Sequence, residues 1–458
     1  MGDFPVTGKR VLVVGAGRSG VAAAQLLLAK GAKVTVADVK PELPEAVCQQ
    51  LAGATIELGP HQPRAFAAAD LIVLSPGVPR DEAAVKAARR AGVTVVGELE
   101  LASRFLRGPV IAVTGTKGKS TTVTLIGRML EAAGMTTAVG GNIGRALSLQ
   151  ALASTPDTLH VVEASSFQLE TVETFHPWIA VFLNFSPDHL DRHASVEEYR
   201  DAKRRIFAEQ TDRDWAVVNA DDPQVVEMAR KGRARQLPFA LDTPLAEGVV
   251  TSGDRIVHRT PAGDVPLIPV ASVRLQGRHL MADVLAAASA ARVAGVPPEG
   301  MAVAVGSFTG LEHALERVAE IDGVWFFNDS KATNVEAARC SVESFAGGLV
   351  PIVGGRFKGG DLRLLREPLA GRARAVVTIG EARALVREAV GDLVPIREAA
   401  SMAEAVRTAF DAARPDGTVL LAPACASFDM FVDYAERGRV FKQEVARLAE
   451  ERREKRER

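Results

Sequence analysis

Short apolar, β-branched runs alternate with longer segments of helical periodicity along most of the chain. This alternation is typical of α/β domains, because the strands of a parallel sheet are joined by crossover helices. The pattern starts afresh near residues 109 and 310. We therefore predict three α/β domains with mainly parallel sheets, over residues 1–108, 109–309 and 310–458.

The strands that we expect are short runs of Val, Ile, Leu, Ala and Phe between turn residues. They cover 10–14, 33–37 and 71–74 in the first block, 110–113, 159–162, 179–183 and 215–218 in the second, and 324–327, 349–353, 375–379 and 418–422 in the third. Alternating runs broken by Gly, Pro and Asp over 248–275 predict an antiparallel β insert. An alanine-rich helix is expected over 281–293, and the mixed-charge tail at 450–458 predicts a solvated or frayed helix end.

Composition narrows the class of protein. A chain of 458 residues fits about three domains. With 55 basic and 56 acidic residues, a general nucleic-acid or membrane-surface binder is disfavoured. The cysteines Cys48, Cys340 and Cys425 lie far apart, which predicts neither a disulfide framework nor a zinc site. No signal peptide or run of about 20 apolar residues is visible, so we expect a cytoplasmic protein.

The first glycine-rich loop, Gly15-Ala-Gly-Arg-Ser-Gly20, lies between an expected strand and helix, and Asp38 ends the next strand. Glycines in this pattern let the backbone approach a diphosphate at the helix N-terminus. The motif indicates a diphosphate-bearing ligand more firmly than a nicotinamide. An NAD-dependent dehydrogenase, a UDP-sugar site and a simple tight turn therefore all stay open at this point.

The second glycine-rich loop, Thr114-Gly-Thr-Lys-Gly-Lys-Ser-Thr121, also follows a strand and opens a helix. It ends like a P-loop: backbone N–H groups can cradle phosphates, Lys119 can reach the β and γ oxygens, and the Ser120 hydroxyl can bind Mg²⁺. The common P-loop spacing needs glycine at Val113, so this loop is shorter. We predict nucleoside triphosphate binding by a P-loop ATPase-like central domain.

Two further residues follow strands of the second block. Glu163 ends one expected strand and His189 lies beyond the end of another. Ligands of open parallel sheets gather at the carboxyl ends of the strands, so Ser120, Glu163 and His189 are expected to converge on a phosphate-bound metal ion. Because Mg²⁺ prefers oxygen ligands, His189 alone is weak support for such a site.

The shortened P-loop resembles that of the Mur ligases, the amide-forming enzymes of peptidoglycan precursor synthesis, and of their folylpolyglutamate synthase relatives. The resemblance extends over essentially the whole chain and is most specific for the members that add D-glutamate. The segments that carry it are Ser75-Pro-Gly-Val78, Gly140-Gly-Asn-Ile-Gly144, Glu163-Ala-Ser-Ser-Phe-Gln-Leu-Glu170, Asn184-Phe-Ser-Pro-Asp-His-Leu-Asp-Arg192, Asn328-Asp-Ser-Lys-Ala-Thr-Asn334 and Pro423-Ala-Cys-Ala-Ser-Phe-Asp429.

The resemblance implies a reaction. ATP and two Mg²⁺ ions would activate the carboxylate of UDP-N-acetylmuramoyl-L-alanine as an acyl phosphate, which the amine of D-glutamate then attacks. It also implies a Rossmann-like UDP-binding domain at 1–108, an ATP-binding domain at 109–309 and a Rossmann-like amino-acid-binding domain at 310–458. The implied partners are small molecules only, with no nucleic acid and no membrane, and a monomer is expected.

The resemblance also implies roles for individual residues. Lys119, His189 and Lys203 are expected to be catalytic, with Lys203 carbamylated by CO₂ so that it joins Ser120, Glu163 and His189 as a metal ligand. Without the resemblance, Lys203 reads as a surface lysine. The expected ATP contacts are Gly115, Thr116, Lys117, Gly118, Lys119, Ser120, Thr121, Asp329 and Lys331. The expected UDP-sugar contacts are Gly15, Gly17, Ser19, Gly20, Asp38, Lys40, Ser75, Asn142 and Ser165. The expected D-glutamate contacts are Thr333, Lys358, Ser427 and Tyr434.

Three positions depart from the family pattern. Leu280 and Asp283 stand where asparagines are usual, and Ala314 stands where arginine is usual. Because these positions help to hold the nucleotide in relatives, we hypothesise that Arg278 or Arg317 supplies a replacement charge. The rival functions are a sister ligase for another amino acid, a dehydrogenase, and a non-catalytic UDP-sugar-binding protein.

Overall fold

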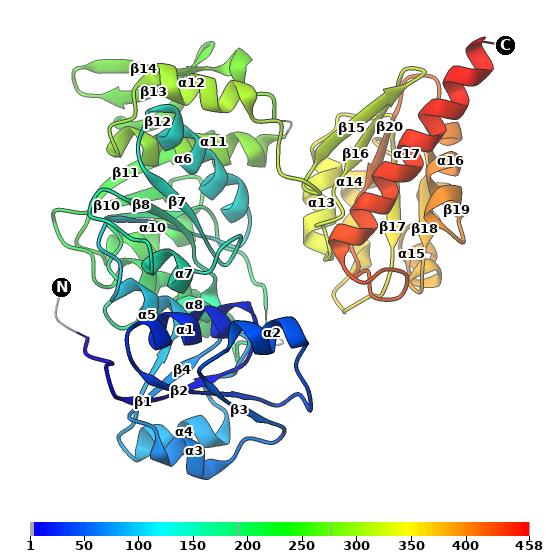
Figure 1. Cartoon of the computed structure of the whole chain (residues 1–458). Helices are drawn as coiled ribbons and strands as arrows, with labels where there is room; N and C mark the ends of the chain where they lie inside the picture. Colours follow the sequence, from blue (N-terminus) through cyan, green and yellow to red (C-terminus); the bar gives the residue numbers. More distant parts are fainter. Residues whose placement is uncertain (1–3, 190–191, 276, 458) are drawn as a thin grey trace. The chain divides into compact units, whose positions relative to one another are not determined.

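The computed structural model describes residues 4–189, 192–275 and 277–457. The chain forms two compact units, one of Met1–Val273 with Ala282–Ser307 and one of Arg274–Met281 with Phe308–Arg458. The described residues of these units form three β-sheets, of which the first is entirely parallel and the others mainly so (Figure 1). The predicted α/β fold class is confirmed.

The first sheet has the strand order β3-β2-β1-β4-β5 and all its pairs are parallel. Val11 and Val13 of β1 pack with α1, whereas Leu12 and Val14 face α3 and α4 on the other side (Figure 1). The strands are β1 (Arg10–Val14), β2 (Lys33–Asp38), β3 (Thr55–Leu58), β4 (Leu71–Leu74) and β5 (Thr94–Gly97). The helices are α1 (Arg18–Ala29), α2 (Glu45–Gln50), α3 (Pro63–Ala68), α4 (Ala83–Arg90) and α5 (Glu98–Ser103).

The second sheet has the order β14-β13-β12-β11-β10-β9-β6-β8-β7. Its strands are β6 (Val110–Thr114), β7 (Thr137–Gly141), β8 (Leu159–Glu163), β9 (Ile179–Phe182), β10 (Trp215–Asn219), β11 (Arg235–Ala240), β12 (Gly248–Ser252), β13 (Arg255–Thr260) and β14 (Gly263–Pro269). The pairs β12–β13 and β13–β14 are antiparallel, so the predicted β insert is confirmed as an extension of the sheet.

The helices of this part begin with α6 (Lys119–Ala132) directly after the second glycine-rich loop. The others are α7 (Leu147–Ala151), α8 (Ser166–Leu169), α9 (Val196–Arg204), the 3₁₀ turns η1 (Arg205–Phe207) and η2 (Val270–Ser272), α10 (Pro223–Arg230), α11 (Arg278–Val293) and α12 (Pro298–Ser307). The expected alanine-rich helix is α11, which begins earlier than its apolar pattern indicates.

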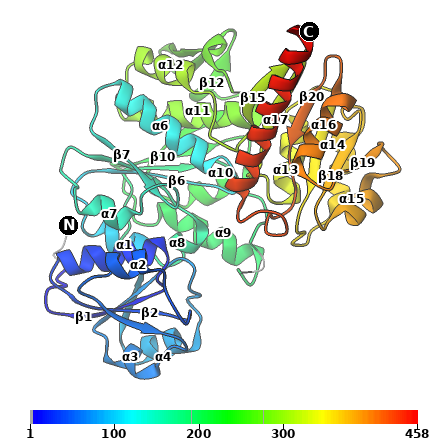
Figure 2. The ribbon, with the colours of Figure 1, turned by 45° about the vertical axis from the view of Figure 1, so that its right-hand side comes forward.

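The third sheet has the order β15-β16-β20-β17-β18-β19, with only β15 antiparallel to its neighbour. Phe326 and Ile352 pack under α16 and α17, while Phe327 and Val353 face α13, α14 and α15 (Figure 2). The strands are β15 (Glu316–Ile321), β16 (Val324–Asn328), β17 (Leu349–Gly354), β18 (Val376–Ile379), β19 (Ile396–Glu398) and β20 (Thr418–Leu421). The helices are α13 (Val335–Glu343), η3 (Leu362–Leu365), α14 (Arg366–Leu369), α15 (Arg383–Val390), α16 (Met402–Ala413) and α17 (Tyr434–Glu457).

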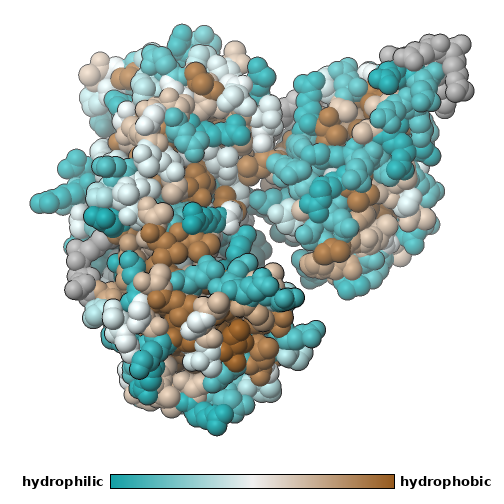
Figure 3. Space-filling model, viewed as in Figure 1, coloured by the Kyte–Doolittle hydropathy of each residue, from teal (hydrophilic) through white to brown (hydrophobic). Residues whose placement is uncertain are grey.

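The C-terminal helix α17 has two contrasting sides. Phe441 and Val445 are buried in the core of the third sheet, whereas hydrophilic residues cover its outer surface in Figure 3. The charged tail continues this helix, as expected for a solvated helix end. Within residues 4–189, 192–275 and 277–457, none of the helices combines the length and apolar composition needed to cross a bilayer.

Candidate active site

The order of the second sheet explains why its functional candidates lie together. β6 lies between β9 and β8, and all three strands are parallel. The second glycine-rich loop follows β6, Glu163 ends β8, and the segment with His189 follows β9. Since the carboxyl ends of these strands share one edge of the sheet, that edge is the natural ligand site of the central part.

The P-loop is held in shape by its own backbone and by Asn184. The Asn184 carbonyl and side-chain oxygens accept N–H groups of Thr116 and Lys117 at 3.0 and 2.9 Å. The Lys119 Nζ donates to the carbonyls of Gly115 and Thr116, both at 2.9 Å. Gly118 has φ of 83°, as expected where the chain turns into α6. The loop therefore presents the N-terminus of α6, a site suited to phosphate.

The carboxylate of Glu163 joins residues from two loops. Ser120 Oγ donates to Oε2 at 2.7 Å, and Asn142 Nδ2 donates to Oε1 at 2.8 Å. Glu163 is only 2% exposed. The expected convergence of Ser120 and Glu163 is thus present, and Asn142 from the predicted UDP-sugar set lies with them. Hydroxyl and carboxylate oxygens are the ligand types that Mg²⁺ prefers.

Lys203 is buried on α9 at 2% exposure, so its interpretation as a surface lysine is wrong. Its Nζ donates to the Gly115 carbonyl at 2.7 Å, directly behind the P-loop. Burial, and next the positive charge of Lys119, hold the pKa of the Lys203 amine well below its usual range. Lys203 is therefore suited to be a neutral, nucleophilic amine at this site.

Tyr199 was not singled out in the sequence, yet it belongs to the same cluster. It is 1% exposed, its Oη lies 3.2 Å from Thr116 Oγ1, and its ring centroid lies 4.9 Å from Lys203 Nζ. The available signal was its spacing, since Tyr199 precedes Lys203 by one helical turn on α9.

His189 lies beside these groups with φ of 55°. Its ring packs edge-on against Phe167 at 5.0 Å between centroids and lies 6.2 Å from the ring of Tyr199. Among the residues described, no three His, Cys, Asp or Glu side chains cluster as a metal site. Since the predicted metal set contains only two such residues, Glu163 and His189, the role of His189 as a ligand stays a prediction.

The first glycine-rich loop depends on Asp38. This carboxylate is 8% exposed and accepts the N–H groups of Ala16 at 2.7 Å and Lys40 at 3.0 Å. A Cβ on Gly20 would lie 1.8 Å from the Gly15 carbonyl oxygen, so only glycine permits this close turn. Asp38 thus holds the loop itself, and its contact with a ligand stays a prediction.

Two arginines that sequence reasoning missed connect the first and second sheets. Arg18, inside the first glycine-rich loop, donates to the Asn142 carbonyl at 3.0 Å. Arg192 donates to the carbonyls of Pro76 and Gly77 at 3.1 and 3.2 Å, next to Ser75. The Arg18 bond joins the first glycine-rich loop to Asn142, and the Arg192 bonds join the Ser75 turn to the segment after β9. Gly15 itself packs against Ser75. Both arginines lie inside quoted motifs, but their inter-loop contacts depend on the tertiary fold.

Ser165 has a local structural role. Its hydroxyl accepts a hydrogen bond from the Gln168 N–H at 3.3 Å, and the Gln168 side-chain oxygen accepts one from the Ser165 N–H at 3.0 Å. This reciprocal pair is a capping box at the start of α8. Ser19 lies in the first turn of α1 after the N-cap Gly17.

In the C-terminal unit, the loops that carry the predicted amino-acid contacts follow β16, β17 and β20, which are adjacent parallel strands. Arg356 and Ala426 exchange two backbone hydrogen bonds, at 2.9 and 3.0 Å, which tie the loop of Lys358 to that of Ser427. Ser427 is buried, and Tyr434 is 40% exposed at the start of α17. The shared strand edge thus gathers Thr333, Lys358 and Ser427 in one part of the unit.

The predicted nucleotide contacts of this unit have partners within it. The carboxylate of Asp329 accepts the Leu315 N–H at 3.1 Å and the Ser341 hydroxyl. The Lys331 N–H donates to the His313 carbonyl at 3.0 Å. The guanidinium of Arg317 lies 3.7 Å from the ring centroid of Trp325 on the same hairpin. A role for Arg317 in nucleotide binding therefore stays a hypothesis, and an unchanged ATP KM in Arg317→Ala would contradict it.

Asp283, one of the departures from the family pattern, packs against the P-loop. It is 3% exposed, and its Oδ2 has no hydrogen-bond partner among the described residues. A Cβ on Gly118 would lie 2.0 Å from Asp283 Oδ1. Burial raises the pKa of this carboxyl group well above its usual range. A buried carboxyl therefore takes the place of the usual amide behind the phosphate-binding loop.

Asp283→Asn is expected to stabilise the protein by about 1–3 kcal/mol at neutral pH, because an amide is neutral without binding a proton, whereas burial of Asp283 requires protonation of a group that is ionised in the unfolded chain. With its pKa raised on folding, Asp283 retains a proton that the unfolded chain loses above about pH 4, so its contribution to stability falls as pH rises. Urea unfolding at pH 4.5 and pH 8 should show the larger gain at pH 8. Glu299→Gln, at an exposed carboxylate on α12, is the control. An equal gain at both pH values would contradict the account.

Three family models match the chain in order: "Mur ligase MurD-like, N-terminal domain" over residues 9–97, "Mur ligase middle domain" over 113–291 and "Mur ligase, glutamate ligase domain" over 315–425. The chain is 46% identical over 450 residues to the UDP-N-acetylmuramoylalanine–D-glutamate ligase of Koribacter versatilis, covering 97% of this chain and 99% of that protein. It is 44% identical over 451 residues to the enzyme of the same name from Pelotomaculum thermopropionicum, again covering 97% and 99%.

Solved structures agree on the fold. A pseudomurein peptide ligase type C from Methanothermus fervidus is 17% identical with a TM-score of 0.60, over 96% of this chain and 100% of that one. The UDP-N-acetylmuramate-alanine ligase MurC from Thermotoga maritima is 18% identical with a TM-score of 0.59, over 96% and 99%. The P-loop and the buried Lys203 behind it agree with these matches. Because three Mur ligase models match the chain in order, and because the chain is 46% identical to a relative over 97% of its length, the chain belongs to the Mur ligase family.

Proposed function

We propose that this protein is an ATP-dependent ligase that joins D-glutamate to UDP-N-acetylmuramoyl-L-alanine in peptidoglycan precursor synthesis. The observation that carries the proposal is the contact of Ser120 and Asn142 with the Glu163 carboxylate at the P-loop, at 2.7 and 2.8 Å. It joins a phosphate-binding element to the region expected to receive the UDP-sugar. The 46% identity to a relative of that name supports the choice of substrates.

The proposal divides the work among the three parts of the chain. Residues 1–108 bind the UDP-sugar, 109–309 bind ATP, and 310–458 bind the amino acid. Thr333, Ser427 and Tyr434 offer hydroxyl groups to D-glutamate, and Lys358 offers a positive charge for a carboxylate. The expectations of a monomer and of a cytoplasmic location stay predictions.

The first step transfers the γ-phosphoryl group of ATP to the carboxylate of the UDP-sugar. A bond forms between phosphorus and a carboxylate oxygen, the bond to the β–γ bridging oxygen breaks, and ADP leaves. Two anions must approach each other, so the charge of Lys119 and the N-terminus of α6 are needed to stabilise the transferring group. Hydrogen bonds to the Gly115 and Thr116 carbonyls hold the Lys119 ammonium group against the P-loop.

Residues of the central part fit Mg²⁺, which would supply charge neutralisation at the phosphates. Ser120 and Glu163 present a hydroxyl and a carboxylate beside the phosphate-binding loop. We propose that these two residues, with His189 and a carbamylated Lys203, hold the metal ions. In the modification, the Lys203 amine nitrogen bonds to the carbon of CO₂ and one proton is lost, which converts a potential cation into an anion. The low pKa of Lys203 supports the neutral amine that this addition needs.

The second step forms the amide bond. The D-glutamate nitrogen, as a neutral amine, bonds to the acyl carbon, the bond from that carbon to the phosphate oxygen breaks, and phosphate leaves while the nitrogen loses a proton. No nucleophile from the protein is required. The residues of the C-terminal unit need only bind and orient the amino acid, which is a contribution of proximity and orientation.

An amino-acid panel tests the proposal. With ATP, Mg²⁺ and UDP-N-acetylmuramoyl-L-alanine, we expect one ADP and one phosphate per amide with D-glutamate, and little with L-glutamate, L-alanine, L-lysine or diaminopimelate. Release dependent on another amino acid would identify a sister ligase. An absence of amide and of ADP with all of them would contradict the proposal.

A further inference from the structure

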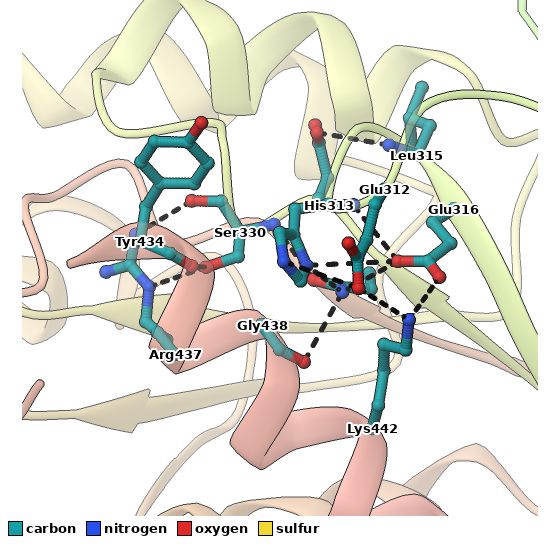
Figure 4. Close-up of polar contacts among 11 residues, drawn as sticks. Glu312, His313, Leu315, Glu316, Ser330, Tyr434, Arg437, Gly438 and Lys442 are labelled. Carbon is teal, nitrogen blue, oxygen red and sulfur yellow. Dashed lines mark hydrogen bonds and ion pairs between the residues drawn. The ribbon is translucent and has the colours of Figure 1, made fainter. Parts of the chain in front are cut away.

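A buried arginine lies behind the candidate amino-acid loops of the C-terminal unit. Arg437, in the first turns of α17, is 1% exposed and is among the largest fully buried side chains described. Figure 4 shows it beside Ser330 and Tyr434. Burial lowers the pKa of its guanidinium to about 10, so it stays charged at neutral pH. A buried charge is costly, and its partners therefore need explanation.

The partners of Arg437 are neutral groups on two loops. Nε donates to Ser330 Oγ at 2.9 Å, Nη2 donates to the Ser330 carbonyl at 2.9 Å, and Nη1 donates to the Cys425 carbonyl at 3.1 Å. The Ser330 hydroxyl in turn donates to the Tyr434 carbonyl at 2.7 Å. None of the ion pairs found between described residues includes Arg437. The planar guanidinium thus joins the Ser330 loop to the Cys425 loop through neutral acceptors, while the nearby charge of Asp429 attracts it without a hydrogen bond or ion pair found between them in the described part of the chain.

A third loop also abuts this guanidinium. A Cβ on Gly355 would lie 3.3 Å from Arg437 Nη1 and 3.2 Å from Cys425 Cβ. Gly355 begins the loop of Lys358, and Cys425 lies two residues before Ser427. The Arg437 guanidinium therefore lies against all three loops that follow β16, β17 and β20. These loops carry the candidate ligand-binding residues.

Further polar contacts, on the residues after Arg437, anchor the same helix. Lys442 Nζ donates to Glu316 at 2.6 Å and to Glu312 at 3.1 Å, and Asn328 Nδ2 donates to the Gly438 carbonyl at 3.4 Å (Figure 4). Phe441 and Val445 add buried apolar contacts. Because these residues fix α17, loss of the hydrogen bonds from the Arg437 guanidinium is expected to loosen the loops after β16 and β20. The helix should stay in place.

We infer that Arg437 is a positioning residue that sets the relative placement of the loop with Asp329, Lys331 and Thr333 and the loop with Ser427. The inference deepens the proposed function and rests on it for the identity of the ligands. A guanidinium is needed because its three nitrogens donate in fixed directions in one plane, which one ammonium cannot match. Arg437 itself has no proposed contact with a substrate.

Steady-state kinetics of Arg437→Met tests this role. We expect the KM values for D-glutamate and ATP to rise about tenfold, since about 1.4 kcal/mol of lost alignment corresponds to that factor. The KM for the UDP-sugar should change less than about twofold, because its candidate residues lie in the other unit. Arg437→Lys should recover part of the loss. If the substitution only lowered the folded fraction of the protein, kcat would fall and all three KM values would stay unchanged. That result would overturn the inference.

Hydrogen exchange gives a readout that does not depend on activity. In Arg437→Met, amides of residues 328–334 and 423–427 should exchange at least about tenfold faster, while those of Val376–Ile379 in β18 stay protected. Arg439→Met, at an exposed arginine on the same helix, should match the wild type. If the wild type shows no D-glutamate-dependent phosphate release, the proposed function fails and exchange alone decides. Unchanged protection of both loops in Arg437→Met would then overturn the inference.

Discussion

Lys119→Met is expected to reduce kcat for ADP release by about 1,000-fold, because removing the charge proposed to meet the transferring phosphoryl group would cost about 4 kcal/mol of transition-state stabilisation. The methionine keeps most of the apolar stem of the side chain and removes the ammonium group. Loss of its bonds to the Gly115 and Thr116 carbonyls should also loosen the P-loop. A coupled ADP assay at saturating substrates measures the effect.

Arg128→Met is the matched control for Lys119. It removes a cation from an exposed position on the same helix, α6, away from the phosphate-binding loop. We expect its kcat to stay within about twofold of wild type. Comparable losses in both variants would mean that the overall charge of α6 matters and would contradict the role assigned to Lys119.

Lys203→Met is expected to lower kcat by at least about 100-fold, because it removes the amine that is proposed to become a metal-binding carbamate. The protein should remain folded, because methionine is an apolar side chain of similar length at a buried position. If Lys203 acts as a carbamate, wild-type activity should fall in CO₂-depleted buffer and return with bicarbonate. The variant should not respond to bicarbonate. The measurement is the initial rate of phosphate release at three bicarbonate concentrations.

Arg204→Met controls for the neighbouring charge on α9, since Arg204 pairs with Asp201 at the surface. It should retain both full activity and the response to bicarbonate. A wild-type rate that is independent of bicarbonate, together with native mass spectra that show only the unmodified lysine in active enzyme, would eliminate the carbamate.

The strands that the sequence predicts well are those buried on both faces. Residues of β6 and β9 are buried throughout, so each reads as an unbroken apolar run. By contrast, β7 ends in two glycines, β11 contains Pro238, and the edge strand β19 is short and partly exposed, so their signals are weak. These strands form only because neighbouring strands provide pairing partners.

The candidate site shows the same division. The phosphate-binding loop is a local motif, so Lys119 and Ser120 can be found from spacing alone. The burial of Lys203, the inter-loop bonds of Arg18 and Arg192, and the role of Arg437 depend on residues far away in sequence. The spacing places Lys203 one helical turn after Tyr199 on α9, but it does not show that the amine of Lys203 is fully buried while the side chain of the neighbouring Arg204 stays partly exposed.

The consequence of the departure at Asp283 could not be predicted from the sequence. The pattern indicates only that the usual asparagine is absent, whereas the structure shows a buried carboxyl against Gly118 with one oxygen unpartnered. An acid that retains its proton can donate a hydrogen bond as an amide does. The substitution is thus compatible with a phosphate-binding loop, with the pH-dependent cost to stability described above.

The transfer of oxygen from substrate to phosphate is a direct consequence of activating the carboxylate with ATP, and it can be measured. UDP-N-acetylmuramoyl-L-alanine labelled with oxygen-18 in both carboxylate oxygens is incubated with ATP, Mg²⁺ and D-glutamate, and the released phosphate is analysed by mass spectrometry. We expect one labelled oxygen in the phosphate for each amide formed, because the carboxylate oxygen leaves with the phosphoryl group. Amide formation with unlabelled phosphate would contradict activation of the carboxylate by ATP.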